Sequence, residues 1–363
     1  MGKDYSDKKI MFITGAISGG GAEKVITILA NGCAEAGAQV SLAILRERHE
    51  SYTVSDKVKV FRIKSGKLKL LSRIKGLRNA IKESGADTLV PFLPIVSLYT
   101  LFAAAGLKKR YIMSERADPN MSIFESTSFK DFVGSLVMRK LQFYRVADRM
   151  VFQTPDAQSY YCKSIREKSE VIPNPLDCKA LPDRFRGERE KSIIAAGRLS
   201  EEKNFGLLLR GFAGFLKNYP DYTLTVCGEG EEREKLESLA SDLGIADKVA
   251  FPGFCDDIHD RMYRAAMYVS TSNHEGISNS MLEALGMGVP TVVTDCPVGG
   301  ARMFVRTDEN GILIPMNDED ALVCAMTKIA SDKNYADTIS AGAEKIREEI
   351  SSDTICRRWM ELC

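Results

Sequence analysis

Short apolar runs alternate along nearly the whole chain with longer segments whose apolar residues recur every three or four positions. This alternation is typical of parallel sheets with helices on both faces, so the predicted class is α/β with two Rossmann-like, doubly wound lobes. In the first half, strands are predicted at residues 9–14, 40–45, 87–92, 110–113, 150–152 and 170–172, with a helix from about residue 22 to a stop at Gly37. In the second half, strands are predicted at 192–196, 223–227 and 311–315, and helices at 204–216 and 231–243.

Two prolines mark the division between the lobes. The segment Val171-Ile-Pro-Asn-Pro leaves a strand and cannot continue any regular element. We therefore expect an N-terminal domain of residues 1–173 and a second domain of residues 174–345. The remaining residues, 346–363, are predicted to be helical.

Cysteine and histidine usage argues against a metal centre. The nine cysteines are scattered without a Cys-x-x-Cys pair, and the three histidines form no His-Glu-x-x-His motif. Such usage is typical of reduced thiols in a cytosolic enzyme. The polar start of the chain lacks the apolar stretch of a signal peptide, so the predicted location is cytoplasmic.

One uncharged stretch, Thr88 to Leu107, has the length of a membrane span. Pro91 and Pro94 interrupt it near its start. We interpret it as a buried strand followed by an apolar helix, which is the usual appearance of a parallel-sheet interior.

Charge is distributed unevenly along the chain. Residues 1–175 carry 28 basic and 17 acidic side chains, a net charge of +11, whereas residues 176–363 carry 22 and 32, a net charge of −10. Eight cations and no acid fall between Arg62 and Lys82. Apolar side chains in the same window recur at helical spacing: Leu70, Ile74, Leu77 and Ile81.

The basic window has two interpretations. It predicts either an ordinary amphipathic helix that covers the sheet, or a surface that docks on an anionic membrane through Lys67, Arg73, Lys75 and Arg78. The uniform sign of the charge favours the membrane, which would make the protein peripheral at the inner face of the cell membrane. Nucleic acid is not expected as a partner, because no aromatic residues are interleaved with the cations.

A glycine-rich loop, Thr14 to Lys24, follows the first predicted strand. It matches neither the dinucleotide fingerprint, whose third glycine is replaced by Lys24, nor a P-loop, which needs Lys-Ser/Thr after its last glycine. The run Gly19–Gly21 indicates either close approach of a ligand to a helix N-terminus or a turn that requires positive φ. The residues of the loop by themselves favour neither interpretation.

Three features follow strands in the second half. Arg198 and Lys203 lie in Gly-Arg-Leu-Ser-Glu-Glu-Lys-Asn, where two cations could meet a diphosphate, although a solvated turn is the simpler reading. Gly228 lies in a second glycine-rich strand end. Glu275 follows a third strand as a candidate acceptor for sugar hydroxyls. Glu283, one turn into the next helix, is also explained by a capping box with Ser280.

Together these pieces resemble the retaining glycosyltransferases of glycosyltransferase family 4, and the likeness spans nearly the whole chain. It rests on the Gly-Gly-Ala-Glu-Lys-Val, Gly-Arg-Leu-Ser-x-Glu-Lys-Asn, Cys-Pro-Val-Gly-Gly-Ala-Arg and Asn-Gly-Ile-Leu-Ile-Pro motifs at 20–25, 197–204, 296–302 and 310–315, and on the Glu275 to Glu283 spacing. The resemblance implies the GT-B fold, in which two lobes face each other across a cleft and C-terminal helices, here 346–363, pack back toward the first lobe.

The resemblance also implies residue roles. Arg198 and Lys203 would stabilise the leaving diphosphate and Glu275 would bind sugar hydroxyls, which makes these three the predicted catalytic set. Glu283 would bind the ribose, and the helix start at Ser278 would offer N–H groups to the diphosphate. The full predicted donor site is Gly21, Arg198, Lys203, Gly228, Glu275, Gly276, Ile277, Ser278, Asn279 and Glu283. Gly20 and Arg116 are expected on the acceptor side.

Two positions depart from the common family pattern. Met303 stands where many relatives carry Glu, and Arg116 stands where many carry His. Because Arg116 would lie near the transferred sugar, its identity leaves the sugar and the acceptor open.

The implied activity is transfer of a hexose or N-acetylhexosamine from a nucleotide diphosphate sugar, expected to be UDP-linked. The acceptor would be a glycan or a lipid-linked sugar in surface polysaccharide assembly, and neither a metal nor another cofactor is expected. Asp256-Asp257 is interpreted as a solvated loop. A nucleotide-sugar epimerase of the same fold and a non-catalytic nucleotide-sugar sensor remain as alternatives.

Overall fold

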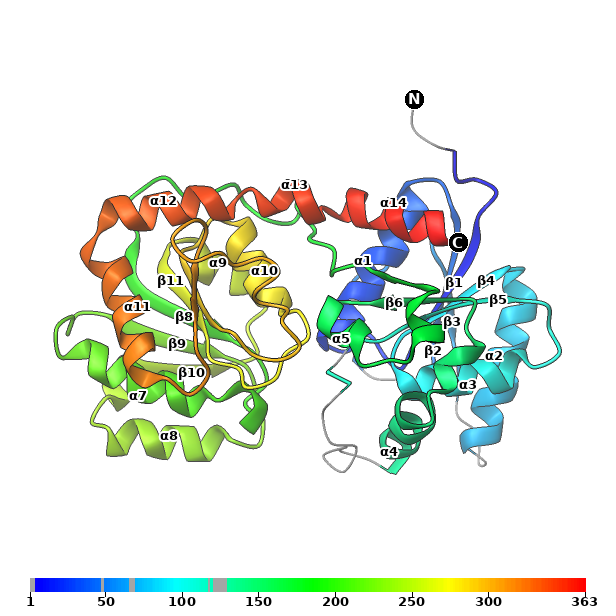
Figure 1. Cartoon of the computed structure of the whole chain (residues 1–363), viewed down its shortest axis with the longest axis horizontal. Coiled ribbons are helices and arrows are strands. Elements are labelled where there is room, and N and C mark those ends of the chain that lie inside the picture. The colour runs from blue at the N-terminus through cyan, green and yellow to red at the C-terminus, as the bar shows by residue number, and fades with distance from the viewer. Residues whose placement is uncertain (1–3, 47–48, 65–68, 117, 120–128) are drawn as a thin grey trace. The chain divides into compact units, whose positions relative to one another are not determined.

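The computed structural model describes residues 4–46, 49–64, 69–116, 118–119 and 129–363. The chain forms two compact units: unit 1 comprises Met1–Pro175 and Ser352–Cys363, and unit 2 comprises Leu176–Ser351 (Figure 1). Each unit is built on a parallel sheet with helices packed against it, which confirms the predicted α/β class with two doubly wound lobes.

The described residues of unit 1 form a seven-stranded sheet of order β3-β2-β1-β4-β5-β6-β7, with parallel pairing throughout. Its strands are β1 (Lys9–Thr14), β2 (Gln39–Ile44), β3 (Lys59–Arg62), β4 (Thr88–Pro91), β5 (Arg110–Ser114), β6 (Arg149–Phe152) and β7 (Ser169–Val171). The predicted strand 9–14 is confirmed, and Ile10 to Ile13 within it are fully buried. β3 escapes the sequence pattern because this edge strand is only partly buried and has no apolar run.

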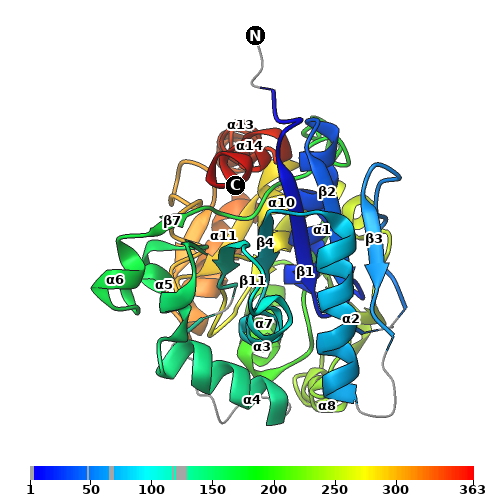
Figure 2. The same ribbon diagram turned by 90° about the vertical axis from the view of Figure 1, so that its right-hand side faces the viewer.

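Helices cover both faces of the unit 1 sheet (Figures 1 and 2). On one face, α2 (Lys69–Ser84) and α3 (Pro94–Ala104) pack together and bury Leu77, Ile81 and Tyr99 against β1 and β2. On the other, α1 (Gly21–Glu35) contacts α14 (Ser352–Leu362). The remaining helical segments are α4 (Phe129–Ser135), η2 (Leu136–Lys140), η3 (Phe143–Val146), α5 (Pro155–Ser159) and α6 (Lys163–Arg166).

The last helix of the chain, α14, packs closely on α1. A Cβ added to Gly32 of α1 would lie 2.5 Å from Sγ of Cys356, so only glycine permits this approach. The buried ring of Trp359 lies 5.8 Å, between centroids, from Phe92 at the end of β4. α14 thereby fixes the C-terminus to unit 1.

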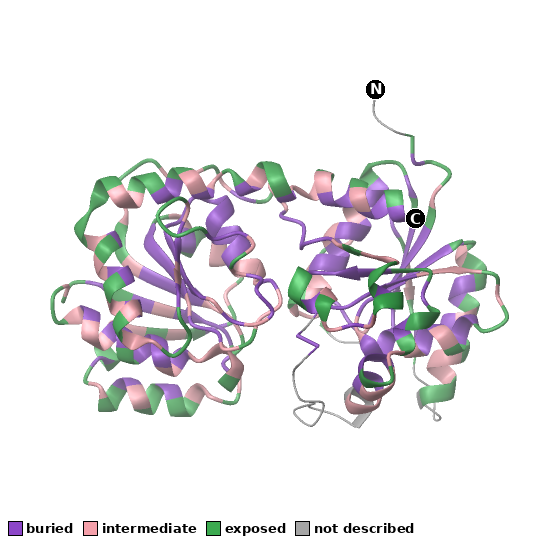
Figure 3. Cartoon of the chain, viewed as in Figure 1, coloured by how far each residue is buried: buried purple, intermediate pink, exposed green. Residues whose placement is uncertain are grey.

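The described residues of unit 2 form a six-stranded parallel sheet of order β10-β9-β8-β11-β12-β13. Its strands are β8 (Glu190–Ala196), β9 (Thr223–Cys227), β10 (Val249–Gly253), β11 (Ala265–Ser270), β12 (Thr291–Thr294) and β13 (Ile312–Ile314). The helical segments are η4 (Glu201–Lys203), α7 (Phe205–Leu216), α8 (Arg233–Asp242), η5 (Ala246–Lys248), α9 (Ile258–Tyr263), α10 (Asn279–Gly286), α11 (Glu319–Ser331), α12 (Lys333–Ala343) and α13 (Ile346–Ile350). Figure 3 shows that the strands in both units are largely buried.

The uncharged stretch Thr88 to Leu107 forms β4 and α3, which confirms its interpretation as a strand followed by a helix. Both elements are largely buried within unit 1. Among the residues that the structure describes, no helix combines the length and the apolarity that crossing a bilayer requires.

A buried ion pair in unit 1 joins Glu115, directly after β5, to Arg139 of η2. The guanidinium of Arg139 donates to both carboxylate oxygens of Glu115, at 2.8 and 2.9 Å, and the two residues are 7% and 1% exposed. The hydroxyls of Tyr161 and Tyr144 donate to the same carboxylate at 3.1 and 3.4 Å. Burial, together with the negative charge of Glu115, raises the pKa of both phenols, so they remain donors.

Replacing Arg139 with Met should destabilise unit 1 by about 3–5 kcal/mol, because it leaves a buried carboxylate without its cation. Trp359, the only tryptophan, lies in unit 1, so its fluorescence during urea unfolding reports this loss. Lys57→Ala, which breaks an exposed ion pair with Glu35, should cost less than about 1 kcal/mol. Adding Glu115→Gln to Arg139→Met should restore part of the stability; a double variant less stable than Arg139→Met would contradict the explanation.

Candidate functional site

The topology of unit 2 places two loops side by side at one edge of the sheet. β8 and β11 are neighbours, but the chain continues from β8 to β9 on one side and from β11 to β12 on the other. The loops after β8 and β11 therefore diverge at this point, and ligands of open parallel sheets bind at such topological switch points. Arg198 and Lys203 follow β8, and Glu275 follows β11.

An ion pair between Lys203 and Glu275 joins these two loops, with both side chains mostly buried. Burial by itself would lower the pKa of Lys203, but the attraction and hydrogen bond of Glu275 outweigh it, so the pKa is raised. The ammonium is therefore charged at neutral pH. Backbone contacts reinforce the junction, because Asn273 N–H donates to Glu202 O at 2.8 Å.

Arg198 differs from Lys203 in being exposed. Its guanidinium makes no hydrogen bond or ion pair with any residue that the structure describes. The backbone around it is fixed, since Gly197 N–H donates to Cys227 O at 3.0 Å. A Cβ on Gly228 would lie 1.8 Å from Gly197 O, so glycine is required at this predicted position. Among the described residues, the site thus presents Arg198 as an exposed cation without a partner, on a loop whose backbone is hydrogen-bonded.

The turn after β12 supports the loop that carries Glu275. Glu275 N–H donates to Pro297 O at 3.0 Å, and Val298 N–H donates to Glu275 O at 3.1 Å. A Cβ on Gly300 would lie 1.7 Å from Gly276 O. The turn therefore holds the predicted Glu275 and Gly276 in place through their backbone.

The helix that follows Glu275, α10, starts at the residues that were predicted to offer N–H groups to the diphosphate. Ser278 is the N-cap of α10, Asn279 is its first residue, and Ser278 Oγ accepts from Met281 N–H at 3.3 Å. The capping box predicted for Ser280 and Glu283 is wrong, because the cap lies two residues earlier. Ile277 is buried directly before the cap.

Glu283 is 7% exposed, and its Oε2 lies 3.0 Å from Nε2 of His259 on α9. Sequence reasoning missed His259, which is 24 residues away from Glu283. The signal was its rarity, as one of three histidines, shortly after the strand end at Gly253.

The glycine loop of unit 1 makes hydrogen bonds with the first turn of the helix that follows it, α1. Gly19 has φ of 103°, which supports the reading of the run as a turn that needs positive φ. Gly20 is the N-cap of α1 and Gly21 its first residue, and Gly20 N–H donates to the Glu23 carboxylate at 3.4 Å. Glu23 therefore satisfies part of the loop that an anion would otherwise meet.

Arg116 follows β5 but is buried. Its guanidinium lies 4.7 Å from the ring centroid of Phe92 and 5.4 Å from that of Trp359, and it donates to Asn174 Oδ1 at 3.1 Å. Burial lowers its pKa to about 9, which leaves it charged at neutral pH. These contacts attach α14 to the sheet; contact of Arg116 with an acceptor remains a prediction.

The basic segment is only partly a free surface. Lys67 lies outside the described residues, Arg73 is half-buried, and Arg78 donates to Ala103 O and Ala105 O, both at 2.8 Å, at the end of α3. Lys75 is exposed. Leu70 and Leu71 are 49% and 62% exposed, although Leu70 was expected on the face that covers the sheet.

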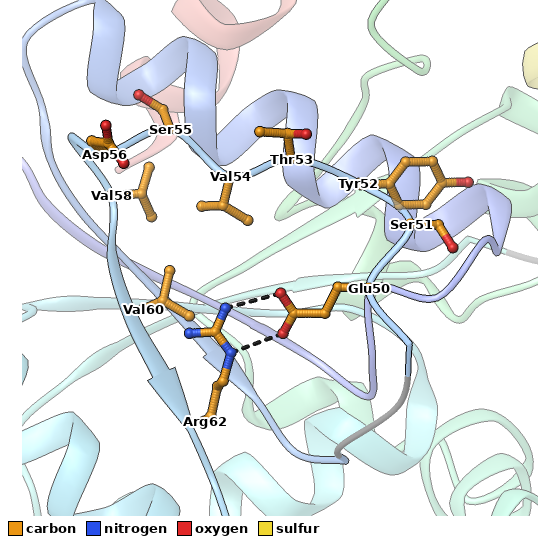
Figure 4. Close-up of a pocket in the computed structure, with 10 residues that line it drawn as sticks. All are labelled: Glu50, Ser51, Tyr52, Thr53, Val54, Ser55, Asp56, Val58, Val60 and Arg62. Carbon is orange, nitrogen blue, oxygen red and sulfur yellow. Dashed lines mark hydrogen bonds and ion pairs between the residues drawn. The ribbon is translucent and has the colours of Figure 1, made fainter. Parts of the chain in front are cut away.

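Unit 1 also contains a cavity of about 540 Å³. The hydroxyl of Tyr52, which lines it, donates to Gly20 O at 3.5 Å. The cavity lies between the segment Glu50–Asp56 and strand β3 (Figure 4). Glu50 and Arg62 form a two-bond ion pair across it, at 2.8 and 2.9 Å. Both side chains are well exposed, so the pair stabilises the fold little.

No metal centre is evident in the described part of the chain, where no three His, Cys, Asp or Glu side chains converge. Asp257 forms an ion pair with Arg261 at 2.8 Å.

Known structures share the fold over the whole chain. Sucrose-phosphate synthase from Thermosynechococcus elongatus superposes with a TM-score of 0.83 at 18% identity, and HepE of Anabaena in complex with UDP and glucose with a TM-score of 0.81 at 19%. Each match covers 98% of both chains. The chain therefore has the GT-B fold that its resemblance implied.

Sequence comparison makes the assignment more specific. The profile "Glycosyltransferase Family 4" matches residues 19–180, and "Glycosyl transferases group 1" matches residues 181–346. The chain belongs to glycosyltransferase family 4, as its motifs indicated.

Two curated relatives align along almost their full length. An "uncharacterized glycosyltransferase" of Haemophilus influenzae is 29% identical, covering 97% of this chain and 99% of the relative. The "GalNAc-alpha-(1->4)-GalNAc-alpha-(1->3)-diNAcBac-PP-undecaprenol alpha-1,4-N-acetyl-D-galactosaminyltransferase" of Campylobacter jejuni is 26% identical, with 98% of each chain covered.

Replacing Lys203 or Arg198 with Ala should reduce sugar transfer at least about a hundredfold, the usual effect of removing one electrostatic stabiliser of a transition state. Near-UV circular dichroism should show a retained fold. Lys191→Ala breaks an exposed ion pair with Asp221 in the same unit and should leave transfer unchanged. Normal transfer by a folded Lys203→Ala variant would disprove the role of this lysine.

Proposed function

We propose that the protein transfers a hexose or N-acetylhexosamine from a UDP sugar with retention of anomeric configuration. The observation that carries the proposal is the convergence of Arg198, Lys203 and Glu275 at the switch point of unit 2. Cations at this point favour binding of a diphosphate, and a carboxylate favours binding of sugar hydroxyls. Structures of Anabaena HepE in complex with UDP and with UDP-glucose support the choice of nucleotide.

In the proposed mechanism, the bond between sugar and diphosphate breaks and its electron pair leaves with the diphosphate. An acceptor hydroxyl forms the new bond on the same face of the sugar and gives its proton to the leaving diphosphate. Arg198, Lys203 and the N-terminus of α10 stabilise the negative charge of the diphosphate because they are already in place. Glu275 accepts hydrogen bonds from the transferred sugar, and Glu283 from the ribose. These groups supply the charge that other transferases take from a metal, so the reaction is proposed to need none.

The proposed acceptor is a glycan on a lipid diphosphate. The name of the Campylobacter jejuni relative specifies such an acceptor, linked to PP-undecaprenol. The basic, partly apolar start of α2 is consistent with it, because Leu70, Leu71 and Lys75 together form an exposed surface. We extend the proposal to reversible docking of this surface on an anionic membrane at its cytoplasmic face.

A thermal-unfolding screen of nucleotide sugars tests the donor. UDP sugars should stabilise the protein by about 2.7 kcal/mol at a hundred times their dissociation constant, and the protein should consume one of them slowly. Both effects should persist in EDTA, and Lys203→Ala should weaken them. Consumption that stops in EDTA and returns with Mn²⁺ or Mg²⁺ would overturn the metal-free mechanism, and epimerised donor would indicate an epimerase.

Sedimentation with lipid vesicles tests the membrane surface. The protein should bind vesicles rich in phosphatidylglycerol at low salt and should not bind phosphatidylcholine vesicles. The reason is that each cation near an anionic surface contributes about 1 kcal/mol to the free energy of binding. Leu71→Ser with Lys75→Ser should release it, whereas Met316→Ser with Lys333→Ser, on exposed positions of unit 2, should not. Equal binding to both lipids would refute docking by charge.

A further inference from the structure

A histidine contacts the carboxylate that we assign to the donor ribose. Nε2 of His259 lies 3.0 Å from Oε2 of Glu283. The Glu283 side chain is 9% exposed and the imidazole 29% exposed, so the ring lies between the buried carboxylate and solvent. This contact is independent of the sequence motifs, none of which includes His259.

The fold brings the two residues together from different strand ends. His259 is the second residue of α9, which connects β10 to β11, and Glu283 is in α10, which follows β11. α9 and α10 pack against each other, and the hydrogen bond fixes the side chain of Glu283 at its exposed end. An imidazole can donate through Nε2 both when neutral and when protonated, so it can orient the carboxylate in either state.

Among the described residues, the ionisable groups around the His259 imidazole lie on α9 itself and on the elements that pack against it. Of the two elements in close contact with α9, α10 contributes Glu283 and β11 contributes Tyr268, which donates to or accepts from Ser280. Burial raises the pKa of Tyr268, so its charge does not change near neutral pH. On α9 itself, Arg261 is paired with Asp257, and Asp260 is the other acid.

We propose that His259 is a positioning residue for Glu283 and that its protonation strengthens donor binding. The inference rests on the proposed function, because it requires that Glu283 binds the donor ribose. As a hydrogen-bond donor, His259 holds the carboxylate in the orientation that receives the ribose hydroxyls. As an imidazolium, it also adds a positive charge near a donor whose diphosphate is negative.

The direction of the pH effect follows from linkage. If the anionic donor favours the imidazolium, donor binding takes up a proton at His259, and affinity falls as pH rises between about pH 5.5 and about pH 8. Uptake of one proton on binding weakens affinity by at most about tenfold for each unit by which pH rises. Neither the diphosphate of UDP-glucose nor its uracil titrates in that range, so the slope reports the protein.

Calorimetric titration with UDP-glucose at several values between about pH 5.5 and about pH 8 tests the proposal. The parent protein should bind about tenfold more weakly at the upper end. His259→Gln keeps an N–H donor without a titratable charge, so its affinity should be nearly constant with pH and close to that of the parent at about pH 8. His259→Ala should bind more weakly than His259→Gln at every pH, because the carboxylate is no longer held. His49→Gln, in unit 1, should retain the parent's pH dependence.

The outcomes separate this inference from the function on which it rests. If UDP-glucose and every other nucleotide sugar fail to bind the folded protein, the proposed function is wrong. If UDP-glucose binds with an affinity that does not change with pH, or if His259→Gln keeps the slope, the role of protonation is refuted. If His259→Ala and His259→Gln bind equally well, positioning by a hydrogen bond is refuted.

Discussion

The ion pair between Lys203 and Glu275 is the interaction on which the geometry of unit 2's site depends. It joins the loops that diverge from β8 and β11, where the sheet provides no backbone pairing of its own. A mostly buried ammonium and carboxylate are tolerated because each compensates the other, and removal of either leaves a costly charge. The surrounding turns can approach closely only because Gly228 and Gly300 lack a Cβ. The Lys203 ammonium is therefore fixed before any ligand arrives, as is the backbone that carries Arg198.

Unit 1 satisfies the charges at the carboxyl ends of its strands in a different way. Glu115 is enclosed by Arg139 and two tyrosine hydroxyls, Arg116 lies against the rings of Phe92 and Trp359, and Glu23 accepts from the glycine loop. Each of these groups has a partner within unit 1, and Glu115, Arg139 and Arg116 are buried. Unit 2 instead exposes Arg198 and keeps Lys203 and Glu275 within reach of solvent. This difference is a physical reason to place donor chemistry in unit 2.

The sequence predicts those features that depend on short-range patterns. β1 has the predicted bounds because its buried interior, Ile10 to Ile13, is an unbroken apolar run. β9 also has the predicted bounds, and α7 ends at the predicted Leu216. β3 has no such run, and the cap of α10 at Ser278 was misplaced because Ser280 offered an equally plausible local pattern. The contacts of Glu275 with Lys203, of Glu283 with His259 and of Arg116 with Trp359 join distant residues. Only the topology brings them together, so composition and spacing could nominate these residues but not their partners.

The two cations differ in what a diphosphate must displace. Arg198 has no partner among the described side chains, so its contact with a phosphate breaks no existing bond within the protein. Lys203 must exchange Glu275 for the phosphate, and that exchange leaves the carboxylate in need of new donors. In the proposed complex, hydroxyls of the transferred sugar are those donors. A nucleotide diphosphate without its sugar would separate Glu275 from Lys203 and supply no hydrogen-bond donor for the carboxylate. The intact donor provides a phosphate for Lys203 and sugar hydroxyls for Glu275. The ion pair thus gives a physical basis for preferring the complete nucleotide sugar over the product nucleotide.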